Sequence, residues 1–446
     1  MFGKFASTNL LHRAARPLIV IAVLASLNTP AVAEPSAAPE TVELTFREFM
    51  SEVAASNLDY AAQRYNVSIA EAQLAIAKLF LPNPTVQFGY SQDVTRGRPR
   101  DQQESKVKNG GFAQTIPIGG KRSARIDAAH HAFLQASATL EDFLRNLRTA
   151  AASAFIEARI KETIAERKKI SADSFDQVAA LAAVRLKAGD IGETDALQAR
   201  VDARRFRSEY LAAESDAENA RIGLSQLLGA ARAGATVRPR ANLEIAAKSY
   251  QLVELVANAL TNRPDVIAAR EAKEAASASV HLARANRIPD PGVGLTYTRT
   301  GSSHNLTAPF DKTDSLQASL SFELPVFTRH AHELEAARFT EHQAERQLDA
   351  ALLKAQVDVR QAFASYERAA QRMVQFRDGA SLADAEKVLA TRRYSYERGA
   401  ATLLDVLQAQ RDLNDLYLDY YDALSAYATT RITLEQAAAL GVTAEF

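Results

Sequence analysis

A turn pattern near the C-terminus of the chain also occurs about two hundred residues earlier, and this repetition constrains the fold more than any other feature. Gly399 lies six residues before Asp405 in the segment DVLQA, and Gly189 lies six residues before Asp195 in the segment DALQA. Each turn lies between two long helical patterns. A glycine at such a place marks a turn, because it readily adopts the left-handed conformation that closes a helix end. The chain is therefore predicted to contain two helical hairpins.

The two hairpins belong to a larger duplicated unit. The segment LPNPTVQFGYS at 81–91 recurs as IPDPGVGLTYT at 288–298, at an offset of 207 residues, and the two Asp residues of the turns are 210 residues apart. A nearly constant offset indicates one duplicated unit. We predict a first structural repeat over residues 45–229 and a second over 251–441, joined by an irregular connector at 230–250. Each repeat has the order helix, strand, loop, strand, long helix and returning helix.

Two short segments in each repeat alternate between apolar and polar residues, which is the pattern of β-strands. The predicted strands cover residues 85–95, 110–118, 291–300 and 315–324. Each has about the length of a strand that crosses a bilayer. Four strands are too few to close a membrane barrel, which needs at least about eight. We therefore predict a mainly α fold with a small transmembrane β-barrel portion, in which a trimer supplies twelve strands.

The helical patterns are too long for an ordinary globular domain. Residues 123–187 contain neither Gly nor Pro and would form a helix of about 100 Å. Residues 45–79 and 194–228 are each about half as long, so these two helices can stack end to end beside the long one. The second repeat has a matching first helix at 252–287 and a hairpin at 328–441, and the first hairpin covers 121–229.

The two returning helices carry further signals. Both end in a Leu-Gly pair, at 228–229 and at 440–441, which predicts a glycine C-cap in each. A strict seven-residue spacing, typical of a coiled-coil seam, connects Val406, Leu413, Tyr420, Tyr427 and Leu434.

The N-terminus predicts secretion. Basic residues precede the apolar run LIVIAVLASL at 18–27, and small residues follow at Ala31 and Ala33. This is the pattern of a signal peptide, which we expect over residues 1–33, with a Pro- and Ala-rich tether at 34–44.

Composition excludes several classes of function. The chain has 53 basic and 53 acidic residues, which gives no support to nucleic-acid binding. It has no Cys, so disulfides and thiol chemistry are excluded. No nucleophile, phosphate or metal motif is present, so we expect neither an enzyme nor a cofactor. The His residues near the starts of the long helices, at 130–131, 330 and 332, fit no compact ligand set, and no metal site is predicted.

With these motifs in this order and in two copies, the chain resembles the TolC-like outer membrane efflux channels over essentially its whole mature length. The resemblance implies a homotrimeric, passive conduit that contacts outer membrane lipid and extends into the periplasm. It also implies docking onto a periplasmic adaptor (membrane fusion) protein and an inner-membrane pump of the RND type. The loops at 96–108 and 301–314 would then lie outside the cell.

Two questions stay open from the sequence. One branch of the family exports heavy-metal cations, and the choice between metal cations and drugs is not decided. The alternative function is a periplasmic adaptor-type coiled-coil protein of a transport complex, although an adaptor would have one hairpin and more β-structure.

The resemblance implies a gate at the hairpin tips. Asp195 and Tyr396 resemble a pair that links the first returning helix to the second long helix, and Asp405 resembles a member of an acidic ring that constricts the pore. The chain departs from the family at two positions. Ala401 stands where the best-known member has an Arg tether, and Gln408 stands at the second acidic position. Closure is therefore expected to be looser or to depend on other contacts.

The tips are also the expected contact with the adaptor. The residues assigned to this contact are Leu186, Ala188, Gly189, Gly399 and Ala400. For Asp195 a purely structural role is open as well, because Asp near a helix start commonly caps the helix.

Overall fold

The computed structural model describes residues 41–95, 103–232, 234–241, 248–302, 311–378 and 381–441. These residues belong to one compact unit, Glu40–Phe446. The predicted signal peptide and parts of the tether, of the connector and of the two predicted outer loops lie outside the described residues. Among the described helices, none combines the length and the apolar composition that a membrane span requires.

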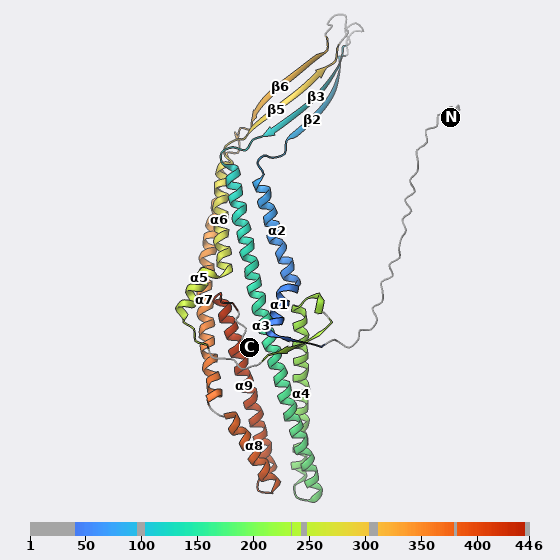
Figure 1. Ribbon diagram of the computed structural model, residues 1–446, viewed down its shortest axis with the longest axis vertical. Coiled ribbons are helices and arrows are strands. Elements are labelled where there is room, and N and C mark those ends of the chain that lie inside the picture. The colour runs from blue at the N-terminus through green and yellow to red at the C-terminus, as the bar shows by residue number, and fades with distance from the viewer. Residues whose placement is uncertain are drawn as a thin grey trace, which may run out of the picture. The chain divides into compact units, whose positions relative to one another are not determined.

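The two repeats fold with the same order of elements (Figure 1). The first repeat contains α1 (Phe46–Ser56), α2 (Leu58–Lys78), β2 (Thr85–Thr95), β3 (Gln103–Thr115), α3 (Lys121–Ala188) and α4 (Glu193–Leu227). The second repeat contains α5 (Leu252–Asn262), α6 (Pro264–Ala285), β5 (Pro291–Thr300), β6 (Thr313–Phe322), α7 (Ala331–Asp378), α8 (Ser381–Glu397) and α9 (Leu403–Ala437). The pattern predicted one long helix in place of α7 and α8, and the two residues between them are not described.

The strands β2, β3, β5 and β6 form one antiparallel sheet in that order (Figure 1). Strand β3 begins earlier than predicted, because residues 103–109 pair with residues 89–95 of β2. It ends at Thr115, before Pro117, which has no amide hydrogen to donate to a ladder. Strand β6 lies two residues earlier than predicted, since Phe322 is the last residue paired with β5.

The sequence predicted irregular structure for the tether and the connector, but both contain regular elements. They contribute β1 (Thr41–Thr45) and β4 (Thr236–Arg240), which pair in parallel, together with a short 3-10 helix at Ala230–Arg232. Val237 is fully buried in a core cluster that also contains Leu44. Five-residue strands nearly two hundred residues apart leave little periodic signal, and the Pro in β4 argues locally against a strand.

Shorter helices stack beside the long helix of the first repeat, as predicted. Both α2 and α4 pack along α3 (Figure 1). At the junction, the Asn57 side chain accepts a hydrogen bond from the Tyr60 amide (2.9 Å) and donates one to the Leu227 carbonyl (3.1 Å). Asn57 thus caps the start of α2 and the end of α4. It also interrupts the helix predicted over residues 45–79, because it adopts an extended conformation between α1 and α2.

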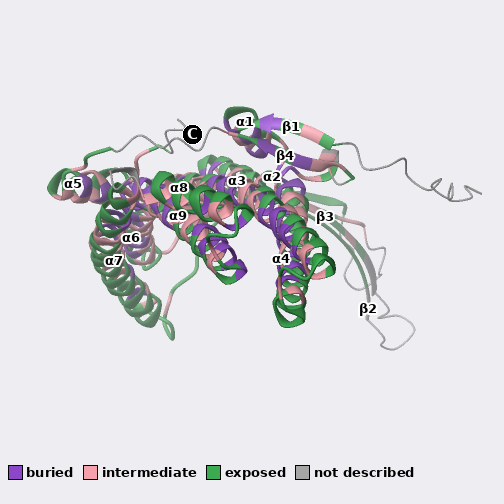
Figure 2. Cartoon of the chain, turned by 90° about the horizontal axis from the view of Figure 1, so that it is seen from below, coloured by how far each residue is buried: buried purple, intermediate pink, exposed green. Residues whose placement is uncertain are grey.

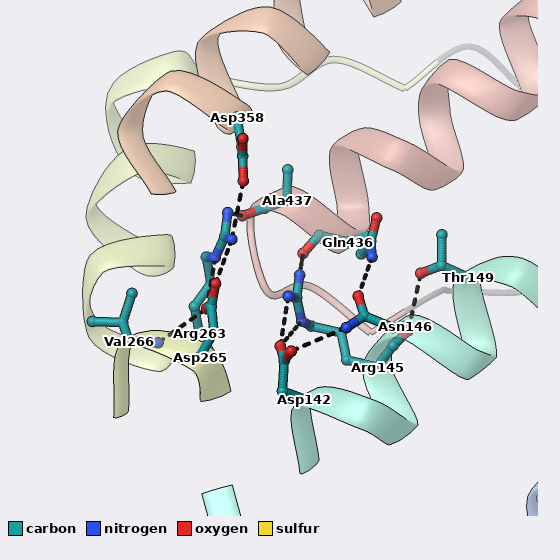
Figure 3. A network of polar contacts seen from close by, with 10 residues as sticks. All are labelled: Asp142, Arg145, Asn146, Thr149, Arg263, Asp265, Val266, Asp358, Gln436 and Ala437. Carbon is teal, nitrogen blue, oxygen red and sulfur yellow. Dashed lines mark hydrogen bonds and ion pairs between the residues drawn. The ribbon is translucent and has the colours of Figure 1, made fainter. Parts of the chain in front are cut away.

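The second repeat has the same junction with charged residues. Arg263 occupies the position of Asn57 between α5 and α6, and interrupts the helix predicted over 252–287 immediately before Pro264. Its side chain is 3% exposed, and its guanidinium contacts Asp265 (2.7 Å) and Asp358 (3.1 Å). It also donates to the Ala437 carbonyl at the end of α9 (Figure 3). The pattern did not predict this break, although a Pro at the first helical position is a known start signal.

Buried residues lie on the facing sides of α3, α4 and α9 (Figure 2). The predicted seven-residue seam of α9 is buried at Val406, Leu413, Tyr427 and Leu434 and half-buried at Tyr420. The end of this helix differs from the prediction. Ala439, with φ +55°, closes α9, whereas Gly229, with φ +72°, closes α4.

Candidate functional site at the hairpin tips

Each hairpin turns through a left-handed glycine. Gly189 has φ +82° and Gly399 has φ +75°. In the first turn the amide of Asp190 donates to the Arg185 carbonyl (2.9 Å), and in the second the amide of Ala400 donates to the Ser395 carbonyl (2.8 Å). These bonds satisfy the last carbonyls of α3 and α8 in the way of a Schellman motif.

The residues assigned to adaptor contact lie at the surface of these two turns. Ala188, Gly189, Gly399 and Ala400 are exposed, and Leu186 is half-buried. A Cβ atom built on either glycine would have no neighbour within 4 Å. The tips therefore offer accessible backbone.

The two returning helices begin with different chemistry. Thr402 and Asp405 form a capping box at the start of α9, in which the carboxylate accepts from the Thr402 amide (2.9 Å) and hydroxyl (2.7 Å). At the start of α4, Gly192 takes the place of the Thr and has no side chain to cap with. Asp195 is exposed in the first turn of α4, where a negative charge favours the helix dipole.

The capping box makes the start of α9 sensitive to pH. Hydrogen bonds from the Thr402 hydroxyl and amide hold the pKa of Asp405 below its ordinary value, and Arg392 contributes in the same direction. A lowered pKa in the folded state means that the stabilisation is present at neutral pH and is lost as the pH falls through that value. We expect Asp405→Asn to weaken hydrogen-exchange protection in the first turn of α9 at neutral pH.

Comparing wild type with Asp405→Asn at two pH values tests whether the charge of the Asp405 carboxylate causes the loss of protection. At a pH well below this lowered pKa, where wild-type Asp405 is protonated, the two proteins should exchange alike. Asp195→Asn is the matched control, because Asp195 has the same place in α4 without a Thr partner, and it should change protection less. Equal protection of wild type and Asp405→Asn at neutral pH would show that the box contributes nothing.

The predicted link between Asp195 and Tyr396 is wrong for this structure. Tyr396 is 4% exposed and packs in a cluster with Phe175 and Val406. Its hydroxyl is buried and has no hydrogen-bond partner among the described residues. Asp195 instead remains exposed. The Tyr396 ring packs into this apolar cluster, and its hydroxyl does not contact Asp195.

Arg185, which the sequence analysis did not single out, joins the two hairpins at this level. Its guanidinium carbon lies 4.2 Å from the centroid of the Tyr396 ring. Its Nη2 donates to the carbonyl of Glu397, in the last turn of α8, at 3.1 Å. The available signal was a basic residue four positions before the Gly189 turn, which is a common feature of helix ends and is not specific.

Further from the tips, buried polar contacts connect the hairpins. Asp202 of α4 is 3% exposed and accepts from Arg411 of α9 at 2.6 Å. The hydroxyl of Ser174 donates to Gln410 (3.0 Å). The second predicted ring position, Gln408, is exposed on α9.

Gln408 lies on an acidic stripe of α9. Its amide donates to Asp412 at 2.7 Å. The stripe consists of exposed carboxylates spaced three or four residues apart, at Asp412, Asp415, Asp419 and Asp422. This spacing places them on one face of the helix. Sequence analysis missed the stripe, although the spacing was visible.

The His residues are dispersed. His131 contacts Glu271 of α6 at 2.8 Å, and His330, immediately before α7, contacts Glu333 in the first turn of that helix. Within the described ranges, no group of three or more His, Asp or Glu residues has a geometry that could hold a metal ion.

Comparison with known proteins adds independent findings. A family model described as outer membrane efflux protein matches residues 49–230 and 255–440. The cobalt-zinc-cadmium resistance protein CzcC of Cupriavidus metallidurans is 26% identical over an alignment of 401 residues, which covers 88% of this chain and 89% of that protein.

Solved structures show the same fold. CusC matches with a TM-score of 0.72 and 18% identity over 92% of this chain and 96% of its own. The Neisseria gonorrhoeae MtrE outer membrane channel in its open state matches with a TM-score of 0.70 and 18% identity, covering 89% of each chain.

Proposed function

The chain belongs to the outer membrane efflux protein family, and from this premise we propose that three copies form a conduit from the periplasm to the exterior. Membership confirms the resemblance to TolC-like channels, the outer membrane location and the efflux function, and it excludes the adaptor alternative. The proposal goes further in assigning the trimer, the docking partners, the gate and the transported substrate.

The two faces of the sheet carry this proposal. Residues that lie directly opposite one another on the four strands form rows across the sheet. One row consists of Val86, Phe112, Leu295 and Ala318. The adjacent row joins Gln87, Gly111, Thr296 and Gln317. Val293, Leu295 and Tyr297 of β5 are exposed, and Thr296 and Thr298 between them are half-buried. A sheet with one apolar and one polar face suits a wall between lipid and water.

The unpaired sheet edges support the trimer. Strands β2 and β6 are the outer strands of the four-stranded sheet. An exposed edge presents unpaired backbone groups, which lipid cannot satisfy. Pairing of β6 in one copy with β2 in the next would use both edges and give twelve strands from three copies.

The partners follow from the family and from the tips. Ala188, Gly189, Gly399 and Ala400 expose backbone at the two turns, and we assign them to contact with a periplasmic adaptor that connects to an RND-type inner-membrane pump. This assignment uses the exposed surface and the family's role in efflux.

Divalent metal cations are the proposed substrates. The relative named for cobalt, zinc and cadmium resistance matches nearly the full length of the chain. We assign Asp405 to an acidic ring, followed along α9 by the stripe that begins at Asp412. Carboxylates spaced along a conduit attract cations and repel anions.

Two adjacent substitutions in β5 test the conduit. Leu295→Arg places a charge on the apolar face near the middle of the strand, and Thr296→Arg places the same charge on the polar face. We expect Leu295→Arg to cost about 2–4 kcal/mol per copy and to abolish trimers in the membrane. Thr296→Arg should leave the trimer intact and lower the preference for Zn²⁺ over chloride in planar bilayers.

Light scattering in detergent and reversal potentials measure these effects. Wild type should be trimeric and cation-selective. A monomer that conducts, or equal assembly defects in both variants, would contradict the assignment of the two faces.

A further inference from the structure

Arg185 connects the two hairpins at their tips, and we propose that it is the positioning residue that holds the proposed gate closed. The inference rests on the proposed function, because a gate has meaning only in a conduit. It supplies a contact in place of two that the family resemblance predicted: the Arg tether, which is Ala401 here, and the hydrogen bond from Tyr396 to Asp195.

The geometry gives Arg185 two separate attachments on α8. Its Nη2 donates to the Glu397 carbonyl at 3.1 Å, and its guanidinium carbon lies 4.2 Å from the Tyr396 ring centroid. The carbonyl belongs to the last turn of a helix, where the backbone dipoles favour a positive charge. The ring face favours a cation as well.

Both partners of this contact are held in place by other interactions. The carbonyl of Arg185 itself accepts from the Asp190 amide at 2.9 Å, so its backbone is part of the helix cap of α3. Tyr396 is 4% exposed and lies in the same buried cluster as Phe175 and Val406. The guanidinium therefore joins two ordered helix ends.

A Lys cannot reproduce this contact in full. The planar guanidinium can lie over a ring and direct an N–H group to a carbonyl at the same time, whereas an ammonium is a compact point charge. The identity of the side chain, as well as its charge, should therefore matter.

Arg185 can be replaced without disturbing the other polar contacts between the two hairpins, so its effect on closure can be measured separately from an effect on folding. The buried pair of Asp202 and Arg411 connects α4 to α9 further from the tips and does not involve Arg185. Loss of the Arg185 contacts should thus loosen the tips, while the buried cluster around Tyr396 and the rest of the two hairpins stay packed. Arg207 is the matched control, because it is a half-exposed Arg of the same hairpin whose ion pairs, with Asp173 and Asp176, stay within that hairpin.

The experiment compares Arg185→Ala, Arg185→Lys and Arg207→Ala in two assays. The chain has no Cys, so Ala188→Cys and Ala400→Cys provide unique spin-label sites on the two tips. Labelled copies are diluted with unlabelled ones, so that one trimer contains one pair. Single channels are recorded from the same proteins without labels.

We expect Arg185→Ala to lengthen and broaden the tip-to-tip distance and to raise the open-to-closed ratio by about two- to tenfold. Arg185→Lys should lie between Arg185→Ala and wild type, and Arg207→Ala should match wild type. The temperature at which the trimer dissociates should not change. In a Tyr396→Leu background the effect of Arg185→Ala should shrink, because the two residues share one interaction.

The outcomes test the role of Arg185 separately from the proposed conduit. Wild-type distances and open-to-closed ratio in Arg185→Ala would overturn the role of Arg185, and so would an equal change in Arg207→Ala. A wild-type protein that does not conduct would refute the conduit, while the distances would still report whether Arg185 joins the tips.

Discussion

Replacing Arg263 with Met should destabilise the protein by about 3 kcal/mol, because it leaves two carboxylates without their partner at a buried junction. Arg263 is 3% exposed and contacts Asp265 and Asp358 (Figure 3). Burial disfavours its charge, but the hydrogen bonds and charges of both Asp residues outweigh this and raise the pKa of Arg263. The expected cost is at the low end of the range for broken buried pairs, since the two carboxylates remain 24% and 35% exposed.

The same substitution should loosen the end of α9. Arg263 donates to the Ala437 carbonyl at 3.4 Å, and Arg145 donates to the Gln436 carbonyl at 2.9 Å (Figure 3). Removing one of these donors leaves a helix end with fewer partners. Hydrogen exchange at the end of α9 and the dissociation temperature of the trimer measure the two effects.

Two controls separate charge from size. Arg346→Met removes an exposed Arg whose partner is Asp349, both of them largely in water, and should change stability by less than about 0.5 kcal/mol. Adding Asp265→Asn and Asp358→Asn to Arg263→Met should restore part of the loss, because no buried charge is then unpaired. Arg263→Met that is as stable as Arg346→Met would show that the junction does not depend on this ion pair.

These two junctions show what sequence patterns could and could not predict. Long helices and alternating strands leave a periodic signal, so α3 and the strands β2, β5 and β6 were predicted to within about two residues, whereas β3 begins seven residues earlier than predicted. Asn57 and Arg263 break helices whose apolar pattern continues on both sides, so the pattern alone joined α1 to α2 and α5 to α6. Pro264 gives a local signal for the break at Arg263, whereas the break at Asn57 is explained by its contact with the end of α4.

For the candidate gate as well, the sequence predicted the local features but not the contacts between hairpins. Both turns were predicted, because a left-handed Gly at a helix end is a local property. The partner of Tyr396 was predicted incorrectly, because it depends on how two hairpins pack, and the ring contacts Arg185 from the other hairpin. Residue types and spacing within one helix contain no information about such a contact.

Gly229→Ala should also cost about 3 kcal/mol, because two penalties coincide at the end of α4. Gly229 has φ +72°, a left-handed conformation that disfavours any side chain. A Cβ atom there would lie 2.4 Å from the backbone carbonyl oxygen of Ser56, at the end of α1. Backbone atoms cannot move away as a flexible side chain can, so the clash adds to the strain. Thermal dissociation of the trimer measures the loss.

Two further substitutions separate the penalties at Gly229. Gly189 has a similar φ of +82° but open space around its Cβ position, so Gly189→Ala should cost only about 1 kcal/mol of strain. Ala439 takes the place of Gly229 in the second repeat with φ +55°, and Ala439→Gly should therefore be neutral or stabilising by up to about 1 kcal/mol. If Gly229→Ala costs no more than Gly189→Ala, the close approach of α1 to the end of α4 does not hold, and the end-to-end stacking in the first repeat is looser than the contacts of Ser56 indicate.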